Sequence, residues 1–577
     1  MKQGRIKQKE KLILLALFFI IIFVTFFTSV RRNLPNIYND EFGYWNSAAW
    51  FAGYDWSEVS SITQYYSYGY GIILSCLLRL FKSTTIAYHL AILLNAIWIA
   101  LSFLVLEAIC SKLYKDIGML KKISMSLLGT LFASNLTQRN YTWPECLLFL
   151  LFCLNVYLII LICEKVTYIR IMWLSIISIF TYTIHQRTLA VVVANIIVIF
   201  LLLIQKKITK KDVAVFLFVF LAAFIAHIIV KNEIILQVWN NSESSEVNNM
   251  GSQIGKLNFL MSLDGIKTFF LTLLGRIYYM AVSSFLLVFF AIESLIKKIA
   301  SSCRKKIIDE VSVFLILSLL FGLGISTASM FTSDFSDVSH IVYGRYLDNF
   351  MGPFILIGLC ELKNGKHGLK RIIFYVNNLL ILGLAVSLMW EIYHPQWVSD
   401  INNSGIALWV SSEGIRVWPA IAIAILVWCI IYGMTHIRKG REEWKNLMIF
   451  LVLMVIWGTN GKIAQKKFDS QTVAIQLSSE ECAKIIDDIR GNYRGKISIY
   501  AAEIVEPMGK WVNYSANGVQ FLCEDANIKY IDVYSELDDK NYIALLPVGF
   551  DVPENMKVIY QTEKYILLTD ENSNVSY

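Results

Sequence analysis

The strongest constraint on this chain is the repetition of long apolar runs. Segments 12–30, 146–163, 213–230 and 418–434 carry almost no charge, and each approaches the roughly 20 residues that a helix needs to cross a membrane. Apolar residues make up 56% of the 577 residues and charged residues only 17%, against about a quarter in soluble domains. The pattern predicts a polytopic α-helical membrane protein.

About thirteen transmembrane helices are predicted. The first apolar run is too long for a signal peptide and lacks a small-residue cleavage site, so we interpret it as a retained span. The predicted spans are 12–30, 84–108, 123–136, 143–163, 171–184, 188–204, 213–230, 268–296, 311–330, 346–362, 373–390, 417–436 and 446–458.

Lysine and arginine are distributed unequally between the two sides that these spans define. Loops on the side of the N-terminus carry 28 Lys and Arg, whereas the longer connections on the other side carry 11. The positive-inside rule therefore places the N-terminus in the cytoplasm of a cell membrane protein. The net charge of +8 is spread over short loops between spans, which argues against a nucleic-acid partner.

The segment after the last span, 459–577, has a different composition. It carries 12 Lys and Arg against 18 Asp and Glu. Short strands are expected at 496–501, 530–533, 542–546, 558–560 and 565–568, with a capped helix at 478–489. We therefore divide the chain into a membrane domain, 1–458, and a small extracytoplasmic α/β domain, 459–577. Whether Cys482 and Cys523 form a disulfide there stays open.

The first outer loop, 31–83, is rich in acids and aromatic residues. Asp40 and Glu41 open a segment whose apolar side chains recur at helical spacing, which suits a helix lying in the outer interface. Tyr66 and Tyr68 belong to a second aromatic stretch near the membrane. The simpler structural interpretation is that the two acids only favour the start of a helix.

Basic residues are scarce on the outer side, yet three short outer connections each hold one beside an aromatic or histidine. They contain Arg139, the pair His185 and Arg187, and Arg345. Together these basic residues suit an anionic ligand such as a phosphate. Each one alone could instead extend its charged group to the membrane–water interface or pair with a nearby acid. Two residues inside their spans also need partners: Glu145, a candidate partner for Arg139, and Arg276. Asp334, Asp337 and His340 could ligate a cation, but their spacing is unspecific.

With these features, the chain resembles the GT-C superfamily of membrane glycosyltransferases that use polyprenyl-phosphate sugars, in the branch of protein mannosyltransferases and aminoarabinose transferases. The resemblance rests on Asp40-Glu41 in the first outer loop, interfacial helices after it, the number of spans and the extracytoplasmic C-terminal domain. Arg345-Tyr346 at the start of a late span also resembles the family.

The resemblance implies transfer of a sugar from a polyprenyl-phosphate donor to an acceptor hydroxyl at the outer face, with inversion, in cell-envelope glycan or glycoconjugate synthesis. Asp40 would be the catalytic base, and Glu41 would support it through hydrogen bonds or a cation. Arg139, His185, Arg187, Arg345, Tyr66 and Tyr68 are the expected substrate and phosphate ligands. No cofactor is certain, and a divalent cation held by Glu41, Asp337 or His340 stays open. The acceptor could be a glycan, a lipid or a protein.

Two other classes of function remain. A lipid-linked oligosaccharide flippase or other transporter also has many spans, but often shows repeated halves and broken helices, for which the sequence gives no sign. A polysaccharide polymerase or ligase commonly carries a long late catalytic loop, and the outer connections 231–267 and 391–416 keep that class open.

Overall fold

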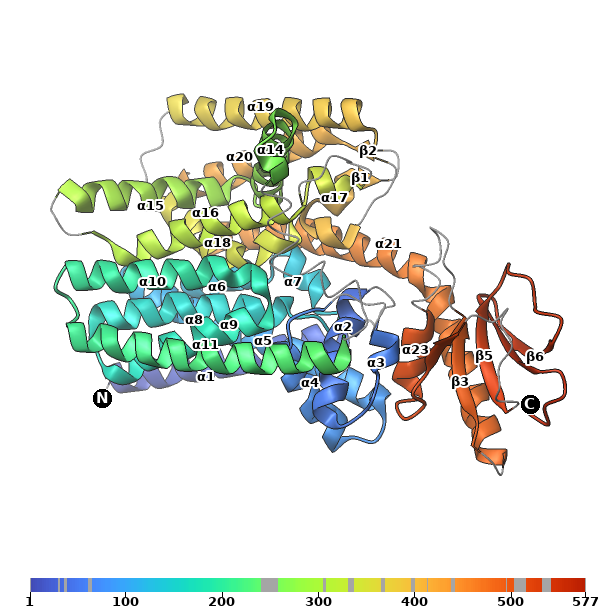
Figure 1. Cartoon of the computed structure of the whole chain (residues 1–577). Helices are drawn as coiled ribbons and strands as arrows, with labels where there is room; N and C mark the ends of the chain where they lie inside the picture. The colour runs from blue at the N-terminus through green and yellow to red at the C-terminus, as the bar shows by residue number, and fades with distance from the viewer. Residues whose placement is uncertain are drawn as a thin grey trace.

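The protein is a helical membrane bundle with a small α/β domain at one end (Figure 1). The computed structural model describes residues 2–29, 32–35, 39–60, 65–239, 258–304, 308–330, 337–364, 369–395, 400–411, 414–436, 442–493, 496–502, 515–531, 541–575 and 577. The predicted cation ligand Asp334, parts of loop 31–83 and much of the outer connection 231–267 lie outside these residues.

The helices of the first half are α1 (Lys2–Phe27), α2 (Asn39–Ala52), α3 (Ser57–Ser60), α4 (Gly69–Leu80), α5 (Thr84–Leu113), α6 (Met119–Thr130), α7 (Ala133–Gln138), α8 (Glu145–Glu164), α9 (Tyr168–Ile184), η1 (Gln186–Thr188), α10 (Leu189–Ile204) and α11 (Lys210–Val238). Those of the second half are α14 (Leu263–Ser283), α15 (Leu287–Arg304), α16 (Glu310–Met330), α17 (Val338–Ile341), α18 (Arg345–Asn364), α19 (Leu369–Tyr393), η2 (Asp400–Trp409), α20 (Val417–His436), α21 (Glu442–Asn492) and α23 (Ser515–Leu522).

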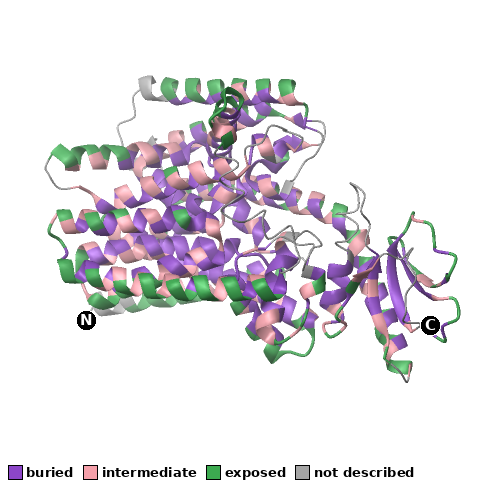
Figure 2. Ribbon diagram, viewed as in Figure 1, coloured by how far each residue is buried: buried purple, intermediate pink, exposed green. Residues whose placement is uncertain are grey.

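Among the described residues, nine helices are long and apolar enough to cross a membrane, or ten if the bent pair α14–α15 counts as one span. The other three predicted spans, 123–136, 171–184 and 346–362, are helical but do not pass this test. Buried residues fill the centre of the bundle, while α11 and α19 expose apolar side chains along their length (Figure 2). Such exposure is what lipid contact requires.

The predicted span 268–296 is not one continuous helix, because the chain breaks between α14 and α15 with a bend of 105°. Phe285 and Leu286 adopt left-handed backbone angles at the break, with φ of 51° and 65°. Both side chains are buried, and Phe285 stacks on Trp457 with ring centroids 6.1 Å apart. Packing therefore imposes a conformation that these two residues disfavour locally.

The boundary predicted at residue 459 falls inside one continuous helix. α21 has 51 residues and is therefore about 76 Å long, at 1.5 Å per residue. Its first half packs in the bundle and its second half carries the α/β domain (Figure 1). The separate helix predicted at 478–489 is the end of α21.

The C-terminal domain contains a five-stranded mixed sheet. Its strands are β3 (Ser498–Ala502), β4 (Lys529–Ile531), β5 (Tyr542–Pro547), β6 (Met556–Gln561) and β7 (Tyr565–Asp570), in the order β4-β3-β5-β7-β6. β3 pairs in parallel with β4 and β5, and β7 pairs antiparallel with β5 and β6. A separate two-stranded ribbon joins β1 (Val410–Ser411) to β2 (Gly414–Ile415). All ten cysteines are described and free, so Cys482 and Cys523 are not paired.

Helix α2 is the element that places the predicted catalytic acids. It packs on α4, where a Cβ on Gly71 would lie 2.6 Å from the Cβ of Ser47, so glycine permits the close approach. On another side the ring of Trp45 meets Phe521 of α23 edge-on at 5.0 Å. α2 is thus buried from Glu41 to Ala49 between the bundle and the C-terminal domain, and does not lie open on the interface as its sequence suggested.

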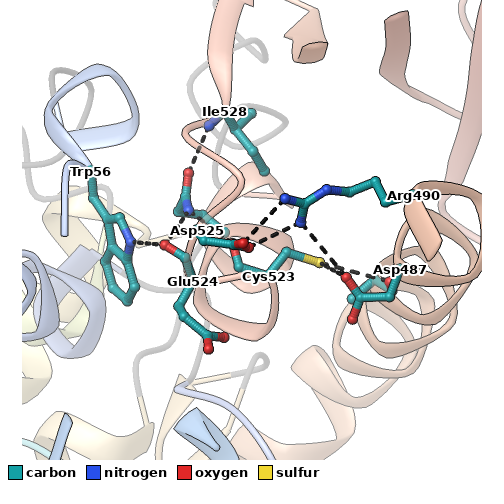
Figure 3. Close-up of polar contacts among 9 residues, drawn as sticks. Trp56, Asp487, Arg490, Cys523, Glu524, Asp525 and Ile528 are labelled. Carbon is teal, nitrogen blue, oxygen red and sulfur yellow. Dashed lines mark hydrogen bonds and ion pairs between the residues drawn. The ribbon is translucent and has the colours of Figure 1, made fainter. Parts of the chain in front are cut away.

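Polar contacts reinforce this junction (Figure 3). The Trp56 indole nitrogen donates to the backbone oxygen of Glu524 at 2.8 Å. Behind it, Arg490 of α21 makes two bonds to Asp525, at 3.0 and 3.2 Å. The first outer loop, α21 and the C-terminal domain therefore meet in one place.

Phe521 should be the main apolar anchor of this junction. It is fully buried against the rings of Trp45, Trp56 and Tyr88. Truncating a buried Phe costs about 3–5 kcal/mol, so Phe521→Ala should loosen the domain and speed its removal by limited proteolysis. Tyr577→Ala, at a side chain that is 65% exposed, is the matched control. Equal digestion of both variants would show that the domain is held elsewhere.

Candidate functional site

A cavity of about 310 Å³ lies where α2, the α9–α10 connection and the start of α18 meet. Its lining is mostly polar and comes from residues far apart in the sequence. The lining residues are Asp40, Tyr65, Tyr66, Ser67, His185, Gln186, Met330, Asp337, His340, Tyr343, Arg345, Tyr346 and Asn402.

Asp40 lies in the first turn of α2, where the helix dipole favours an acid. The Tyr66 hydroxyl donates to its Oδ1 at 2.6 Å, and Arg345 Nη1 donates to its Oδ2. Burial raises the pKa of Asp40, but Arg345 and the hydrogen bonds lower it more, so the pKa lies below its usual value. Asp40 is therefore an ionised carboxylate that faces the cavity.

Arg345 joins Asp40 to a second acid. Its Nε donates to Glu145 Oε1 at 2.6 Å, and Arg187 Nη2 donates to the same oxygen at 3.1 Å. Glu145 stands at the start of α8, and the side chains of all three residues are at most 6% exposed. Two acids and two arginines thus form one cluster in which the formal charges cancel, and all of its side chains but that of Asp40 are buried.

Aromatic rings support both guanidinium groups. Arg345 lies 3.9 Å from the centroid of the Trp143 ring, and Arg187 lies 4.4 Å from that of Tyr346. These contacts hold the cations flat against ring faces, which favours them electrostatically. The edges of the guanidinium groups stay available for acids or for oxyanions.

His185 ends α9 and lines the cavity. Burial, followed by the charges of Arg187 and Arg345, lowers its pKa well below the ordinary value. The backbone N–H of Arg187 donates to His185 Nδ1 at 3.3 Å, which places the proton of the neutral ring on Nε2. His185 is therefore a neutral hydrogen-bond donor rather than a cation.

Glu41 does not line the cavity. Its Oε1 accepts bonds from the backbone N–H and the hydroxyl of Thr142, both at 2.6 Å, and from the Tyr88 hydroxyl at 3.0 Å. Trp45 also donates to the Thr142 hydroxyl at 2.8 Å. Glu41 therefore attaches α2 to the segment that carries Trp143 and Glu145, and positions its neighbour Asp40.

Glu41→Gln should weaken this attachment, since hydrogen bonds to a charged group contribute about 1.5–3 kcal/mol. We expect a clear fall in the thermal unfolding temperature in detergent and partial loss of function. Glu58→Gln, at an exposed acid in the same outer loop, is the control. Unchanged stability together with complete loss of activity would make Glu41 a chemical participant and not a positioning residue.

Two predicted ligands lie elsewhere. Arg139 donates to the Thr25 carbonyl oxygen at 3.1 Å and to the Thr28 hydroxyl at 2.8 Å, at the end of α1. It does not pair with Glu145 as the sequence suggested, because the two arginines described above take that place. The Tyr68 hydroxyl lies 3.2 Å from His227 Nδ1, in an aromatic cluster beside α11. Neither residue lines the cavity.

Of the candidate cation ligands, Asp337 and His340 line the cavity and Glu41 does not. Within the described part of the chain, no three His, Cys, Asp or Glu side chains gather closely enough to hold a metal ion. Arg345 already occupies one oxygen of Asp40. We therefore assign no step to a metal.

Several functional neighbours escaped the sequence analysis. Trp143, Tyr343 and Asn402 carried no distinguishing signal, because aromatic and amide residues are common in the outer loops. Glu145 did carry one, since an acid inside a span requires a buried partner, but the sequence could not say which arginine that was. The sequence likewise did not reveal that the Arg276 guanidinium contacts the Tyr343 ring, whose centroid lies 5.1 Å from its Cζ.

Comparison with solved structures finds the same overall fold in a membrane protein of known structure, over nearly the whole chain. The similar structure is ArnT from Cupriavidus metallidurans bound to undecaprenyl phosphate. It has a TM-score of 0.51 and 10% identity, and the match covers 98% of each chain.

Two further matches are weaker. ArnT from the same organism in the apo state has a TM-score of 0.48 and 11% identity, over 97% of this chain and 98% of that one. The apo oligosaccharyltransferase of Archaeoglobus fulgidus has a TM-score of 0.40 and 10% identity, over 92% and 69%. No family model matches the sequence, and no curated protein matches it. The likeness therefore concerns the fold.

Proposed function

We propose that this protein transfers a sugar from a polyprenyl-phosphate donor to an acceptor hydroxyl at the outer face of the membrane. The observation that carries this proposal is that Asp40, Arg345, Tyr66 and His185 line one polar cavity, beside Arg187. A carboxylate next to a supported arginine suits a reaction in which a proton is removed while a phosphate leaves. The undecaprenyl phosphate bound to ArnT, which shares the fold, supports the donor class.

One group of residues acts on the acceptor hydroxyl and another on the leaving phosphate. Asp40 accepts the proton of the acceptor hydroxyl, whose oxygen attacks the anomeric carbon. The bond from that carbon to the phosphate oxygen breaks, and polyprenyl phosphate leaves with the electron pair. Arg345 stabilises the leaving oxyanion, with His185 Nε2–H as a second donor. Direct displacement inverts the anomeric configuration.

The proposed sidedness places the cavity outside. The N-terminus lies at the end of the bundle opposite the C-terminal domain (Figure 1), and the basic loops lie on the side of the N-terminus. The cavity is at the end that bears the C-terminal domain, because α2 packs against α23. Donor lipids consumed outside would present their sugar phosphates at this end.

A transfer assay tests the proposal. Purified protein in liposomes, given a radiolabelled polyprenyl-phosphate sugar and envelope extract, should release free polyprenyl phosphate in step with labelled product. Movement of intact donor across the bilayer without release would indicate a flippase. Growth of a lipid-linked polymer by repeat units would indicate a polymerase. Activity that survives EDTA would argue against a step that depends on a divalent cation.

A further inference from the structure

Arg345 holds the proposed catalytic base and also faces the place where the donor phosphate must lie. We propose that the donor phosphate displaces Asp40 from Arg345, so that donor binding itself releases the base for the acceptor hydroxyl. This inference rests on the proposed function and goes beyond it, because it assigns Arg345 the coupling of the two substrates and predicts that donor binds first.

Four charged side chains at the cavity balance one another. Asp40 and Glu145 balance Arg187 and Arg345 before any ligand binds. A donor phosphodiester adds one negative charge beside Arg345 and Glu145, whose side chains are only 5% exposed, and an unpaired charge is expensive in such surroundings. One of the arginines must therefore change partner when the donor enters.

Arg345 is the arginine that can do so. Among the described residues that line the cavity, it is the only Arg or Lys. Arg187 lies behind Tyr346 and pairs with Glu145, outside that lining. A phosphate in the cavity therefore meets the Arg345 edge that now binds Asp40.

The rest of the guanidinium is well anchored during such an exchange. Glu145 holds Nε at 2.6 Å, and Trp143 covers one face at 3.9 Å. Nη1 can then pass from Asp40 to a phosphate oxygen without displacement of the whole side chain. Asp40, whose side chain is 29% exposed, keeps only the Tyr66 hydrogen bond and turns to the acceptor.

The exchange also removes a chemical obstacle. A carboxylate paired with arginine is a weak base, because the cation stabilises its ionised form. Once the phosphate binds Nη1, Asp40 becomes a stronger base. This change takes place only in the complex that contains bound donor. The proton lost by the acceptor then resides on Asp40, while the departing phosphate stays on Arg345.

Competition between Asp40 and phosphate can be measured without turnover. The probe is polyprenyl phosphate itself, titrated onto the purified full-length protein in detergent with EDTA. Asp40→Asn frees Arg345 and should bind the probe about tenfold more tightly than the wild type, which corresponds to ~1.4 kcal/mol. Asp337→Asn removes an acid from the same cavity without altering the Arg345 contacts described above, and should change affinity by less than about threefold.

The outcomes separate the two proposals. Equal affinity in the wild type and Asp40→Asn, or an equal gain in both variants, would overturn the exchange while leaving the donor class intact. Absence of probe binding to all three proteins would overturn the donor class, and the exchange with it. Arg345→Lys provides a second check, because a lysine cannot span Glu145 and the phosphate, and this variant should bind the probe more weakly than the wild type.

Discussion

Asp40→Asn should reduce sugar transfer by about 10²–10⁴-fold, the usual contribution of a general base. The asparagine keeps the size of the side chain and an oxygen that can accept the Tyr66 hydroxyl, but it cannot take a proton from the acceptor. The measurement is the initial rate of polyprenyl phosphate release from a labelled donor, at saturating donor and acceptor.

The matched control is Asp55→Asn in the same outer loop, an exposed acid whose Oδ1 accepts a bond from the Ser57 hydroxyl at 2.7 Å. It should keep nearly full activity. The unfolding temperature of Asp40→Asn should stay within a few degrees of the wild type. An Asp40→Asn enzyme with more than about a tenth of wild-type activity would remove Asp40 from the proton transfer.

The largest effect on stability should come from Glu145. Removing one partner from a buried ion pair costs about 3–5 kcal/mol, and here one carboxylate oxygen serves two arginines. Glu145→Ala should therefore lower the unfolding temperature strongly, because Arg187 loses its only described ion pair and Arg345 keeps Asp40 alone. Thermal unfolding in detergent, followed by tryptophan fluorescence, measures it.

The other end of the same helix offers a control for Glu145. Glu164 closes α8 and pairs with Lys112 at 2.7 Å, but both side chains are more than a third exposed. Such pairs contribute about 0–1 kcal/mol, so Glu164→Ala should leave stability almost unchanged. Similar losses of stability in the two variants would mean that the buried ion pairs of Glu145 stabilise the protein no more than an exposed pair does.

Features that depend on composition and charge could be predicted from the sequence. Nine of the thirteen predicted spans, the approximate positions of the five strands and the position of Asp40 in a first helical turn follow local patterns that survive folding. The scarcity of outer cations led the sequence analysis to group Arg345, Arg187 and His185 with Arg139. In the structure His185 and Arg345 line one cavity with Arg187 beside it, whereas Arg139 bonds the end of α1.

Features that depend on packing between distant segments could not be predicted. Arg139 and Arg187 stand in similarly short loops, yet only the latter points to Glu145, because α7 turns the former toward α1. The bend at Phe285 could not be predicted, because no glycine or proline stands at the break. Glu41 was expected to support the base, but its side chain bonds Thr142 and does not line the cavity.

The most direct test of the central claim is a structure of Asp40→Asn with a bound polyprenyl-phosphate sugar. We expect a phosphate oxygen within about 3 Å of Arg345 Nη1. We also expect the anomeric carbon beside residue 40 and the lipid tail directed toward the membrane. A phosphate held in another part of the protein, with Arg345 still bound to residue 40, would contradict it.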